Sequence, residues 1–278
     1  MSYMALAEPG TAPTDEPMSE EEIAAGQSRP KTTPASTGAV VALSGGQDST
    51  TCLYYARQHY APVHAVSFDY GQRHRIELEA AALIAEGAGV PHTILTVDAL
   101  RDMADAGLTN PDIAIAADAT GTGNTYAEAR GLPSSFVPGR NLILLGLAAA
   151  YGLPRDLDTL VTGVCQEDRS GYPDCRGEFV RALEMTIKLG MDHPGFKIDA
   201  PLLTKSKRET WALAHELGGD CLDAVIRDSL TCYEGDAATE NEWGHGCGSC
   251  PACELRRDSF YEWRRNAEMS RPIFPGQH

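Results

Sequence analysis

One stretch constrains the fold more than any other part of the sequence: a short apolar run that passes through two glycines into a group of hydroxyl side chains. Residues 39–43 (Ala-Val-Val-Ala-Leu) are all apolar, which is typical of a strand covered on both faces. Gly45 and Gly46 have no Cβ atom, so the chain can turn tightly and a ligand can approach the backbone. The stretch therefore predicts a buried strand followed by a tight turn.

A helix is predicted directly after this turn, over residues 50–58, with Asp48 or Ser49 as its cap. The start of a helix has free N–H groups and the positive end of the helix dipole, which together favour a phosphate group. The common phosphate-binding loop has a lysine after its glycines, and none follows here. The turn is thus a candidate anion site of another kind, and the alternative is a glycine-rich turn without a ligand.

Charge and composition limit the class of protein. The chain of 278 residues has a formal net charge of −16, which argues against general binding to nucleic acid or to anionic membranes. No apolar run reaches the length of a membrane span, and the N-terminus lacks the basic start and apolar centre of a signal peptide. We therefore expect a cytoplasmic protein, in which clustered cysteines are more often metal ligands than disulfides.

The chain divides into three predicted parts. Residues 1–36 hold five of the 17 prolines and six acidic residues against two basic ones, which predicts a disordered acidic tail. Residues 37–230 alternate between strand and helix patterns and form the predicted main domain. Residues 231–278 hold a group of cysteines and a final helix.

The alternation in the main domain predicts an α/β fold. Strands are predicted at residues 39–43, 64–69, 92–98, 159–164 and 197–200, and helices at 50–58, 75–88, 140–152, 177–190 and 206–217. This order predicts an open parallel sheet with helices on both faces. Ligands bind beyond the carboxyl ends of such strands, so the turn at Gly45 and Asp69 should share one edge. Residues 99–135 are irregular and predict a surface excursion and a candidate lid.

Four cysteines near the C-terminus have the spacing of metal ligands. Cys232, Cys247, Cys250 and Cys253 are separated by fourteen, two and two residues. Four thiolates with no open position describe a structural zinc site, and an iron–sulfur cluster is the alternative. We predict a structural Zn²⁺ that holds the C-terminal segment in place and does not take part in chemistry.

Five short motifs, taken in order, resemble those of one enzyme family. They are Ser-Gly-Gly-Gln-Asp-Ser-Thr-Thr-Cys-Leu (44–53), Ser-Phe-Asp-Tyr-Gly-Gln-Arg-His (67–74), Val-Pro-Gly-Arg-Asn (137–141), Ser-Gly-Tyr-Pro-Asp-Cys-Arg (170–176) and the terminal Cys-Gly-Ser-Cys-Pro-Ala-Cys (247–253). The first resembles the nucleotide loop of the N-type ATP pyrophosphatases, and the whole set resembles the 7-cyano-7-deazaguanine synthases within that group. The resemblance implies an adenine nucleotide alpha-hydrolase-like fold.

The resemblance also implies an activity. It is the conversion of 7-carboxy-7-deazaguanine and ammonia to 7-cyano-7-deazaguanine with ATP and Mg²⁺, in queuosine biosynthesis. A carboxylate is a poor electrophile, so one adenylation would allow amide formation and a second would allow dehydration to the nitrile. The alternatives are a paralogous adenylating enzyme acting on a tRNA base or a protein, and a zinc-stabilised nucleotide-binding module without turnover. The family suggests a homodimer whose other partners are small molecules.

Roles for single residues follow from the same resemblance. The loop would hold ATP with Asp48 as a Mg²⁺ ligand, and Ser44, Asp48 and Lys205 are the candidate catalytic residues. Lys207 is a further candidate for contacting phosphate, as is Arg140. The candidate ATP-binding residues are Leu43, Ser44, Gly45, Gly46, Gln47, Asp48, Ser49, Thr50, Thr51, Cys52 and Leu53, and the candidate deazaguanine-binding residues are Tyr70, Gln72, Arg73, Arg140, Asp168, Tyr172 and Asp174. For the second set the alternative is turn formation or a salt bridge.

Overall fold

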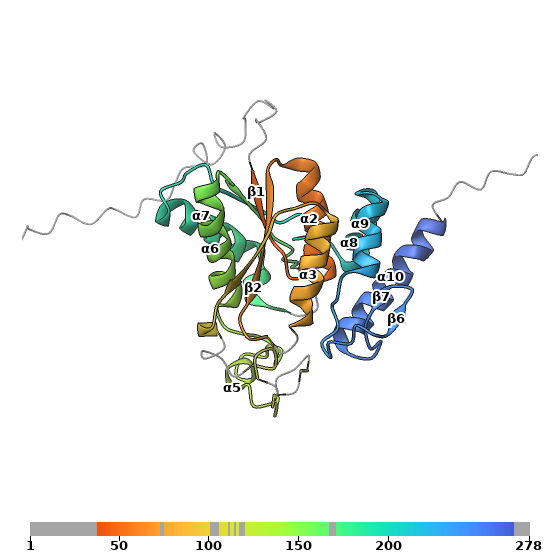
Figure 1. Cartoon of the computed structure of the whole chain (residues 1–278). Coiled ribbons are helices and arrows are strands. Elements are labelled where there is room, and N and C mark those ends of the chain that lie inside the picture. Colours follow the sequence, from red (N-terminus) through yellow and green to blue (C-terminus); the bar gives the residue numbers. More distant parts are fainter. Residues whose placement is uncertain are drawn as a thin grey trace, which may run out of the picture. The chain divides into compact units, whose positions relative to one another are not determined.

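A parallel sheet of five strands organises the main part of the protein (Figure 1). The strands are β1 (Ala39–Ala42), β2 (Val63–Asp69), β3 (His92–Thr96), β4 (Thr159–Val161) and β5 (Lys197–Asp199), in the order β3-β2-β1-β4-β5. All neighbours are parallel, and Val40 of β1 lies opposite His64 on one side and Leu160 on the other. The chain order reverses at β1, so the switch point of the sheet lies between β1 and β4.

The computed structural model describes residues 38–72, 75–100, 106–110, 112–113, 115–116, 120–166 and 171–269. Three predictions fall outside these ranges, namely the tail at 1–36 and the site residues Arg73 and Asp168. The described residues belong to one compact unit, Ser36–His278, and the boundary predicted after residue 230 stays a prediction. No helix in the described ranges has the length and apolar character needed to cross a membrane.

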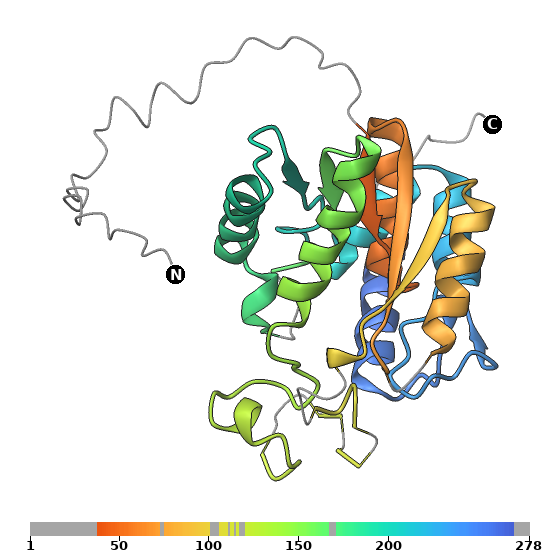
Figure 2. The same ribbon diagram turned by 60° about the vertical axis from the view of Figure 1, so that its left-hand side comes forward.

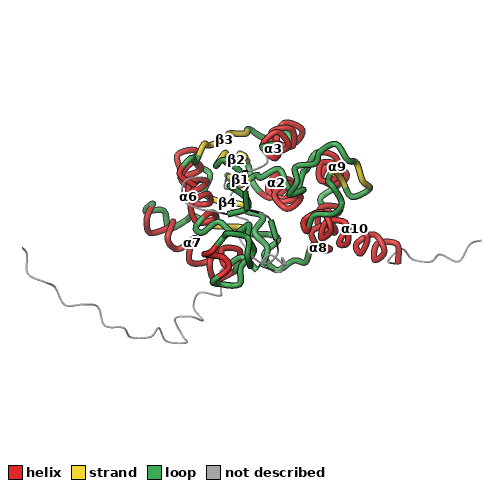
Figure 3. The backbone as a smooth tube through the Cα atoms, turned by 90° about the horizontal axis from the view of Figure 1, so that it is seen from below, coloured by secondary structure: helices red, strands yellow, loops and turns green. Residues whose placement is uncertain are grey.

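Helices cover both faces of the sheet, as Figure 3 shows from the end of the strands. They are α2 (Gln47–His59), α3 (Ile76–Gly87), α6 (Arg140–Gly152), α7 (Gly177–Gly190), α8 (Lys207–Glu216), α9 (Gly219–Arg227) and α10 (Pro251–Met269). One face is covered by α2 and α3, with α8, α9 and α10 packed beyond them, and the other by α6 and α7. This arrangement confirms the predicted open parallel sheet with helices on both faces.

The side chains of β1 explain why both faces must be covered. Ala39 and Val41 pack into the core shared with α2, and Val40 packs into the core shared with α6. All three are fully buried. Alternate residues of a strand point to opposite faces, so an uninterrupted apolar run requires a helix layer on each side.

The predicted elements differ from the structure mainly at their ends. β3 and β4 end at Thr96 and Val161, earlier than residues 98 and 164, where the prediction ended them. α2 begins at Gln47, before the predicted start at residue 50. The predicted cap was wrong, because the N-cap is Gly46 and no side chain caps the helix. Ser49 lies inside the first turn instead, where its hydroxyl donates to the Gly46 carbonyl.

The irregular region at residues 99–135 is only partly a surface excursion. Leu100 and Ala106 are fully buried in the core on the α6 face, which anchors this part of the chain. Farther along, the short helix α5 (Thr125–Glu128) lies beyond the carboxyl ends of the strands (Figure 2). A role as a lid stays a prediction.

Small elements complete the C-terminal part. Two short strands, β6 (Glu240–Asn241) and β7 (Gly244–His245), pair antiparallel and precede α10. Single 3₁₀ turns occur at Leu153–Arg155 and at Pro173–Cys175. The helix α9 follows Gly218, whose φ of +115° only glycine adopts readily.

Candidate functional site

The loop between β1 and α2 is held in shape by hydrogen bonds among its own residues. Ser49 Oγ accepts from the Ser44 N–H at 3.1 Å and donates to the Gly46 carbonyl at 3.1 Å. Thr50 Oγ1 donates to the same carbonyl at 2.8 Å. These hydroxyls order the turn, while the first N–H groups of α2 have no partner within the helix. The turn is therefore an ordered site at which an anion can meet free N–H groups.

Two glycines allow the loop to lie close to its neighbours. Gly45 has a φ of +85°, and a Cβ there would lie 2.3 Å from the carbonyl oxygen of Glu77 in α3. Gly163, just after β4, also packs closely against the start of α2. A Cβ there would lie 3.1 Å from backbone atoms of Asp48 and Ser49. The sequence analysis missed Gly163, whose only signal was its place at the end of a predicted strand.

Asp48 contacts Lys207, one of the residues named from the sequence as candidates for contacting phosphate. Lys207 Nζ lies 2.5 Å from Asp48 Oδ2, whereas Lys205 bonds through its backbone carbonyl to the thiol of Cys165. The start of α8 is fixed by a capping box between Ser206 and Glu209, which sets the place of Lys207 in the first turn. No described residue bonds to the buried Asp48 Oδ1. This oxygen is free to take a cation or a hydrogen-bond donor from a ligand.

A second group of ionisable side chains, the Arg140 cluster, lies at the same edge of the sheet. Its members are Tyr70 after β2, Glu77 in the first turn of α3, Arg140 at the start of α6, and Tyr172 and Asp174 in the segment after β4. Burial lowers the pKa of Arg140, but coulombic interactions with Tyr70, Tyr172 and Asp174 outweigh burial and raise it. The guanidinium is therefore a permanent positive charge in this cluster.

Burial raises the pKa of both carboxyl groups of the Arg140 cluster. Burial raises the pKa of Glu77 to about 7, against the opposing effect of Arg140. Burial also raises the pKa of Asp174, again against Arg140. Asp174 Oδ2 accepts the N–H of Asn141 at 3.3 Å, and Asp174 Oδ1 is buried without a partner among the described residues. Glu77 escaped the sequence analysis because it looked like an ordinary acidic residue in a first helical turn.

Tyr172 joins the Arg140 cluster to the region around α5. Its hydroxyl lies 2.5 Å from Ser135 Oγ, and its ring centroid lies 5.6 Å from that of Phe136. The Arg140 guanidinium carbon lies 5.8 Å from the Tyr172 ring centroid. Burial raises the pKa of Tyr70 and of Tyr172, so both phenols stay protonated and can donate hydrogen bonds.

Gln72, another candidate for contacting a ligand, uses its side chain within its own turn. Its Nε2 donates to the Phe68 carbonyl at 3.1 Å, and its Oε1 accepts the Tyr70 N–H at 3.0 Å. The side chain is buried. The amide group therefore stabilises the turn after β2, which was the alternative considered for this residue.

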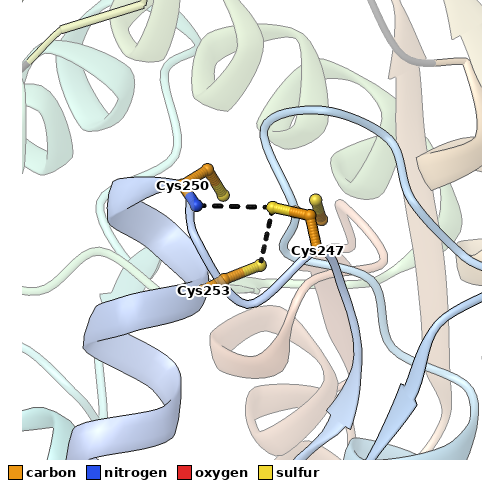
Figure 4. A group of neighbouring side chains, drawn as sticks. Cys247, Cys250 and Cys253 are labelled. Atoms are coloured by element: carbon orange, nitrogen blue, oxygen red, sulfur yellow. Dashed lines mark hydrogen bonds between the residues drawn. The ribbon is translucent and has the colours of Figure 1, made fainter.

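The four cysteines come together as metal ligands do. The sulfur atoms of Cys232, Cys247, Cys250 and Cys253 all lie within 4.8 Å of one another. Figure 4 shows the thiol of Cys247 beside Cys253, at 3.9 Å, and beside the N–H of Cys250, at 3.3 Å. Four sulfurs at about 2.3 Å from one ion would be about 3.8 Å apart, whereas bonded sulfurs are about 2.05 Å apart. The group, called the cysteine cluster below, could thus hold a metal ion.

Comparison with known proteins agrees with these features. A family model described as "Queuosine biosynthesis protein QueC" matches residues 38–264. The 7-cyano-7-deazaguanine synthase of Acidovorax sp. is 46% identical over 241 residues, which cover 84% of this chain and 96% of that protein. The enzyme of the same name from Clostridium botulinum is 43% identical over 227 residues, covering 82% of this chain and 96% of that protein. The chain therefore belongs to the QueC family of queuosine biosynthesis proteins.

Proposed function

We propose that this chain acts as a 7-cyano-7-deazaguanine synthase, an ATP-dependent ligase of queuosine biosynthesis. It would convert 7-carboxy-7-deazaguanine and ammonia to the 7-cyano compound. Family membership and the names of relatives that are 43–46% identical support this proposal. The observation in the structure that carries it is the ordered turn before α2, with Asp48 and Lys207 beside it.

ATP would bind with its phosphates at the start of α2. The free N–H groups there and the Lys207 ammonium would stabilise the negative charge that grows on the leaving pyrophosphate. Asp48 would hold Mg²⁺, since its Oδ1 is buried and no described residue bonds to it. When bound, Mg²⁺ would neutralise phosphate charge. Lys207 was among the residues named from the sequence for contacting phosphate, and the catalytic role named there for Lys205 stays a prediction.

The deazaguanine would bind in the Arg140 cluster. A guanine-type base carries N–H donors on the edge that holds its amino group, and Asp174 Oδ1 is a buried acceptor that no described residue uses. Arg140 would pair with the 7-carboxylate, because guanidinium and carboxylate match in charge and shape. The rings of Tyr70 and Tyr172 would contact the faces of the base. The Arg140 cluster and the loop lie at one edge of the sheet, which would bring the carboxylate and ATP together.

A single assay tests this function. The purified protein is incubated with ATP, Mg²⁺, ammonium and 7-carboxy-7-deazaguanine, and the products are followed by mass spectrometry. We expect the nitrile together with AMP and pyrophosphate. AMP that forms only when tRNA or a protein acceptor is added would favour the paralogous adenylating enzyme. ADP and phosphate as the only nucleotide products would contradict the proposal.

We also propose that the ion held by the cysteine cluster is Zn²⁺. The 3.9 Å between the sulfurs of Cys247 and Cys253 fits ligands of one ion. A cluster of several irons would separate the thiolates more widely.

Metal analysis of the purified protein and of Cys250→Ser tests the assignment of Zn²⁺. We expect one zinc per chain in the parent protein, and in Cys250→Ser loss of zinc together with most of the stability, because binding of about 10–16 kcal/mol rivals the stability of a domain. Full zinc occupancy in Cys250→Ser would contradict the assignment.

A cytoplasmic location and a homodimer belong to the same proposal. Four reduced cysteines placed to bind one ion suit a reducing compartment. The homodimer is expected from the family alone. Light scattering of the purified protein tests it, and a monomer at micromolar concentration would contradict it.

A further inference from the structure

A buried arginine lies between the cysteine cluster and residues 43–53, the candidate ATP-binding stretch that is called the nucleotide loop below. Arg256 of α10 is 1% exposed. Its guanidinium donates to the carbonyls of Val225 at 2.6 Å, Trp243 at 3.0 Å and Ser229 at 3.3 Å, and to Thr231 Oγ1 at 2.9 Å. All of these acceptors are neutral. A fully buried cation bonded only to neutral oxygens needs negative charge nearby, since burial of an isolated charge is unfavourable.

Two negative groups that reach Arg256 belong to the two neighbouring sites. Burial lowers the pKa of Arg256 to about 10, and the charges of Cys253 in the cysteine cluster and Asp48 in the nucleotide loop act against this effect. The arginine therefore adds positive potential at the loop, together with Lys207. A polyanion at the loop would interact favourably with this potential.

A short backbone segment makes the physical connection between these sites. The N–H of Leu230 donates to the carbonyl of Gly45 at 2.9 Å. Thr231 comes next, and its Oγ1 lies 3.9 Å from the place that a Cβ on Gly46 would take. Cys232 of the cysteine cluster follows directly. Three consecutive residues thus connect the two sites. Leu230 bonds to the loop through its backbone, Thr231 places its hydroxyl beside Gly46, and Cys232 supplies a thiol to the cysteine cluster.

The hydroxyl of Thr231 has a proton to donate toward the loop. Because Arg256 donates to Oγ1, that oxygen acts as an acceptor, and its own proton points elsewhere. No described residue takes this proton. A Cβ on Gly46 would lie 3.6 Å from Ser44 Oγ, 3.7 Å from the Leu230 carbonyl oxygen and 3.9 Å from Thr231 Oγ1, so the Thr231 hydroxyl lies within van der Waals reach of the loop backbone. Its free proton therefore lies next to the first N–H groups of α2.

We propose that Thr231 is a further ATP-binding residue, whose hydroxyl donates to an oxygen of the phosphate chain, and that Arg256 is a positioning residue that orients it. This inference rests on the proposed function, because it requires a nucleotide at the loop. It also gives the cysteine cluster a second role, since Cys232 fixes the end of the segment that carries Thr231.

A pair of matched variants tests the assignment of Thr231. Thr231→Val keeps the shape of the side chain and removes the hydroxyl, whereas Thr231→Ser keeps the hydroxyl. We expect Thr231→Val to weaken ATP binding about 10- to 100-fold, as loss of a hydrogen bond to a charged group does. Thr231→Ser should bind ATP within a few-fold of the parent protein. Binding is measured by calorimetry with a non-hydrolysable ATP analogue and Mg²⁺, and metal content and the KM for the deazaguanine should stay unchanged in both variants.

The outcomes separate this inference from the proposed function. Equal ATP affinity in Thr231→Val and the parent protein would overturn the inference, as would a Thr231→Ser variant that is as weak as Thr231→Val. Loss of metal in Thr231→Val would also overturn it, because the residue would then act through the cysteine cluster. A parent protein that binds ATP but forms no nitrile would overturn the proposed function alone, and one that binds no nucleotide would overturn both.

A double-mutant cycle tests the role of Arg256. If Arg256 acts on ATP through Thr231, Arg256→Lys should weaken ATP binding in the parent protein and have little further effect in Thr231→Val. Additive effects would show that the arginine does not act through the hydroxyl. Should Arg256→Lys not fold, the Thr231 pair still decides whether the hydroxyl binds ATP.

Discussion

The nucleotide loop and the Arg140 cluster lie at one edge of the sheet, yet they are built in opposite ways. The loop is one continuous stretch whose hydroxyl groups bond to its own backbone. The Arg140 cluster gathers side chains from four separate segments and buries a guanidinium and two carboxyl groups together. The loop therefore depends on backbone shape, and the cluster depends on charge and pH. Substitutions can test this contrast.

The largest effect is expected from Asp48→Ala, which removes the only acidic side chain of the loop. AMP formation should fall about 100- to 1,000-fold, as it does when a charge-stabilising group is lost from an active site. The fold should persist, because among the described residues Asp48 pairs with Lys207 through one carboxylate oxygen and its other oxygen has no partner. The measurement is the rate of AMP release, with circular dichroism as a check of folding.

Asp69→Ala is the matched control for this substitution. Asp69 ends β2 at the same edge of the sheet, but its carboxylate pairs with the exposed Arg75 at 2.6 Å. This variant should keep most of the activity. If Asp48→Ala and Asp69→Ala lowered the rate of AMP release to a similar extent, activity would depend on negative charge anywhere at this edge of the sheet and not on Asp48 in the loop.

Gly45→Ala tests the dependence of the loop on backbone shape. A left-handed residue other than glycine costs about 1–2 kcal/mol, and here the new Cβ would also meet the Glu77 carbonyl. Gly89→Ala shares the left-handed backbone, with a φ of +63°, but its Cβ would meet no atom within 4 Å. Urea unfolding should show a clearly larger loss of free energy of unfolding for Gly45→Ala. Equal losses of free energy of unfolding in the two variants would show that α3 shifts to accommodate the new Cβ without further destabilisation.

Asp174→Asn tests the charge of the Arg140 cluster. The amide oxygen can still accept the Asn141 N–H, but an NH₂ group replaces the buried acceptor Oδ1. The KM for 7-carboxy-7-deazaguanine should rise about 10- to 100-fold, since a hydrogen bond to a charged group is lost. The KM for ATP should not change. A rise in the KM for ATP alone would assign Asp174 to the nucleotide.

The smallest expected effect is the pH dependence that Glu77 introduces. In the unfolded chain this carboxyl titrates near 4.5, and in the folded protein burial raises its pKa to about 7. The folded state then binds the proton more tightly, so this contribution to stability is complete below pH 4.5 and is lost as pH rises to 7. Through Glu77, the free energy of unfolding changes with pH by at most about 1.4 kcal/mol per pH unit.

Glu77→Gln cannot titrate and should remove this slope. Urea unfolding of both proteins at pH 5, 6 and 7 gives the comparison. The free energy of unfolding should fall more steeply with pH in the parent protein than in the variant. Parallel curves would show that Glu77 does not titrate in this range.

The two regions also differ in how far they could be predicted from sequence. The turn at Gly45 and the cysteine spacing were recognisable because the interacting atoms lie close together along the chain. Most members of the Arg140 cluster were singled out only through the family resemblance, and Glu77 was missed. Which of the two lysines contacts Asp48 has the same origin, since Lys205 and Lys207 are two positions apart and only the start of α8 decides that Lys207 turns toward the loop.

The sequence alone determined the strand–turn–helix order, the parallel sheet with helices on both faces, and the spacing of the four cysteines. These follow from local rules, since apolar periodicity, glycine at turns and short ligand gaps act over a few residues. Only the tertiary structure decided that Arg140 meets Glu77 and Asp174, and that Thr231 lies beside Gly46. Such pairs are distant in the chain, and their contact depends on how the helices pack on the sheet.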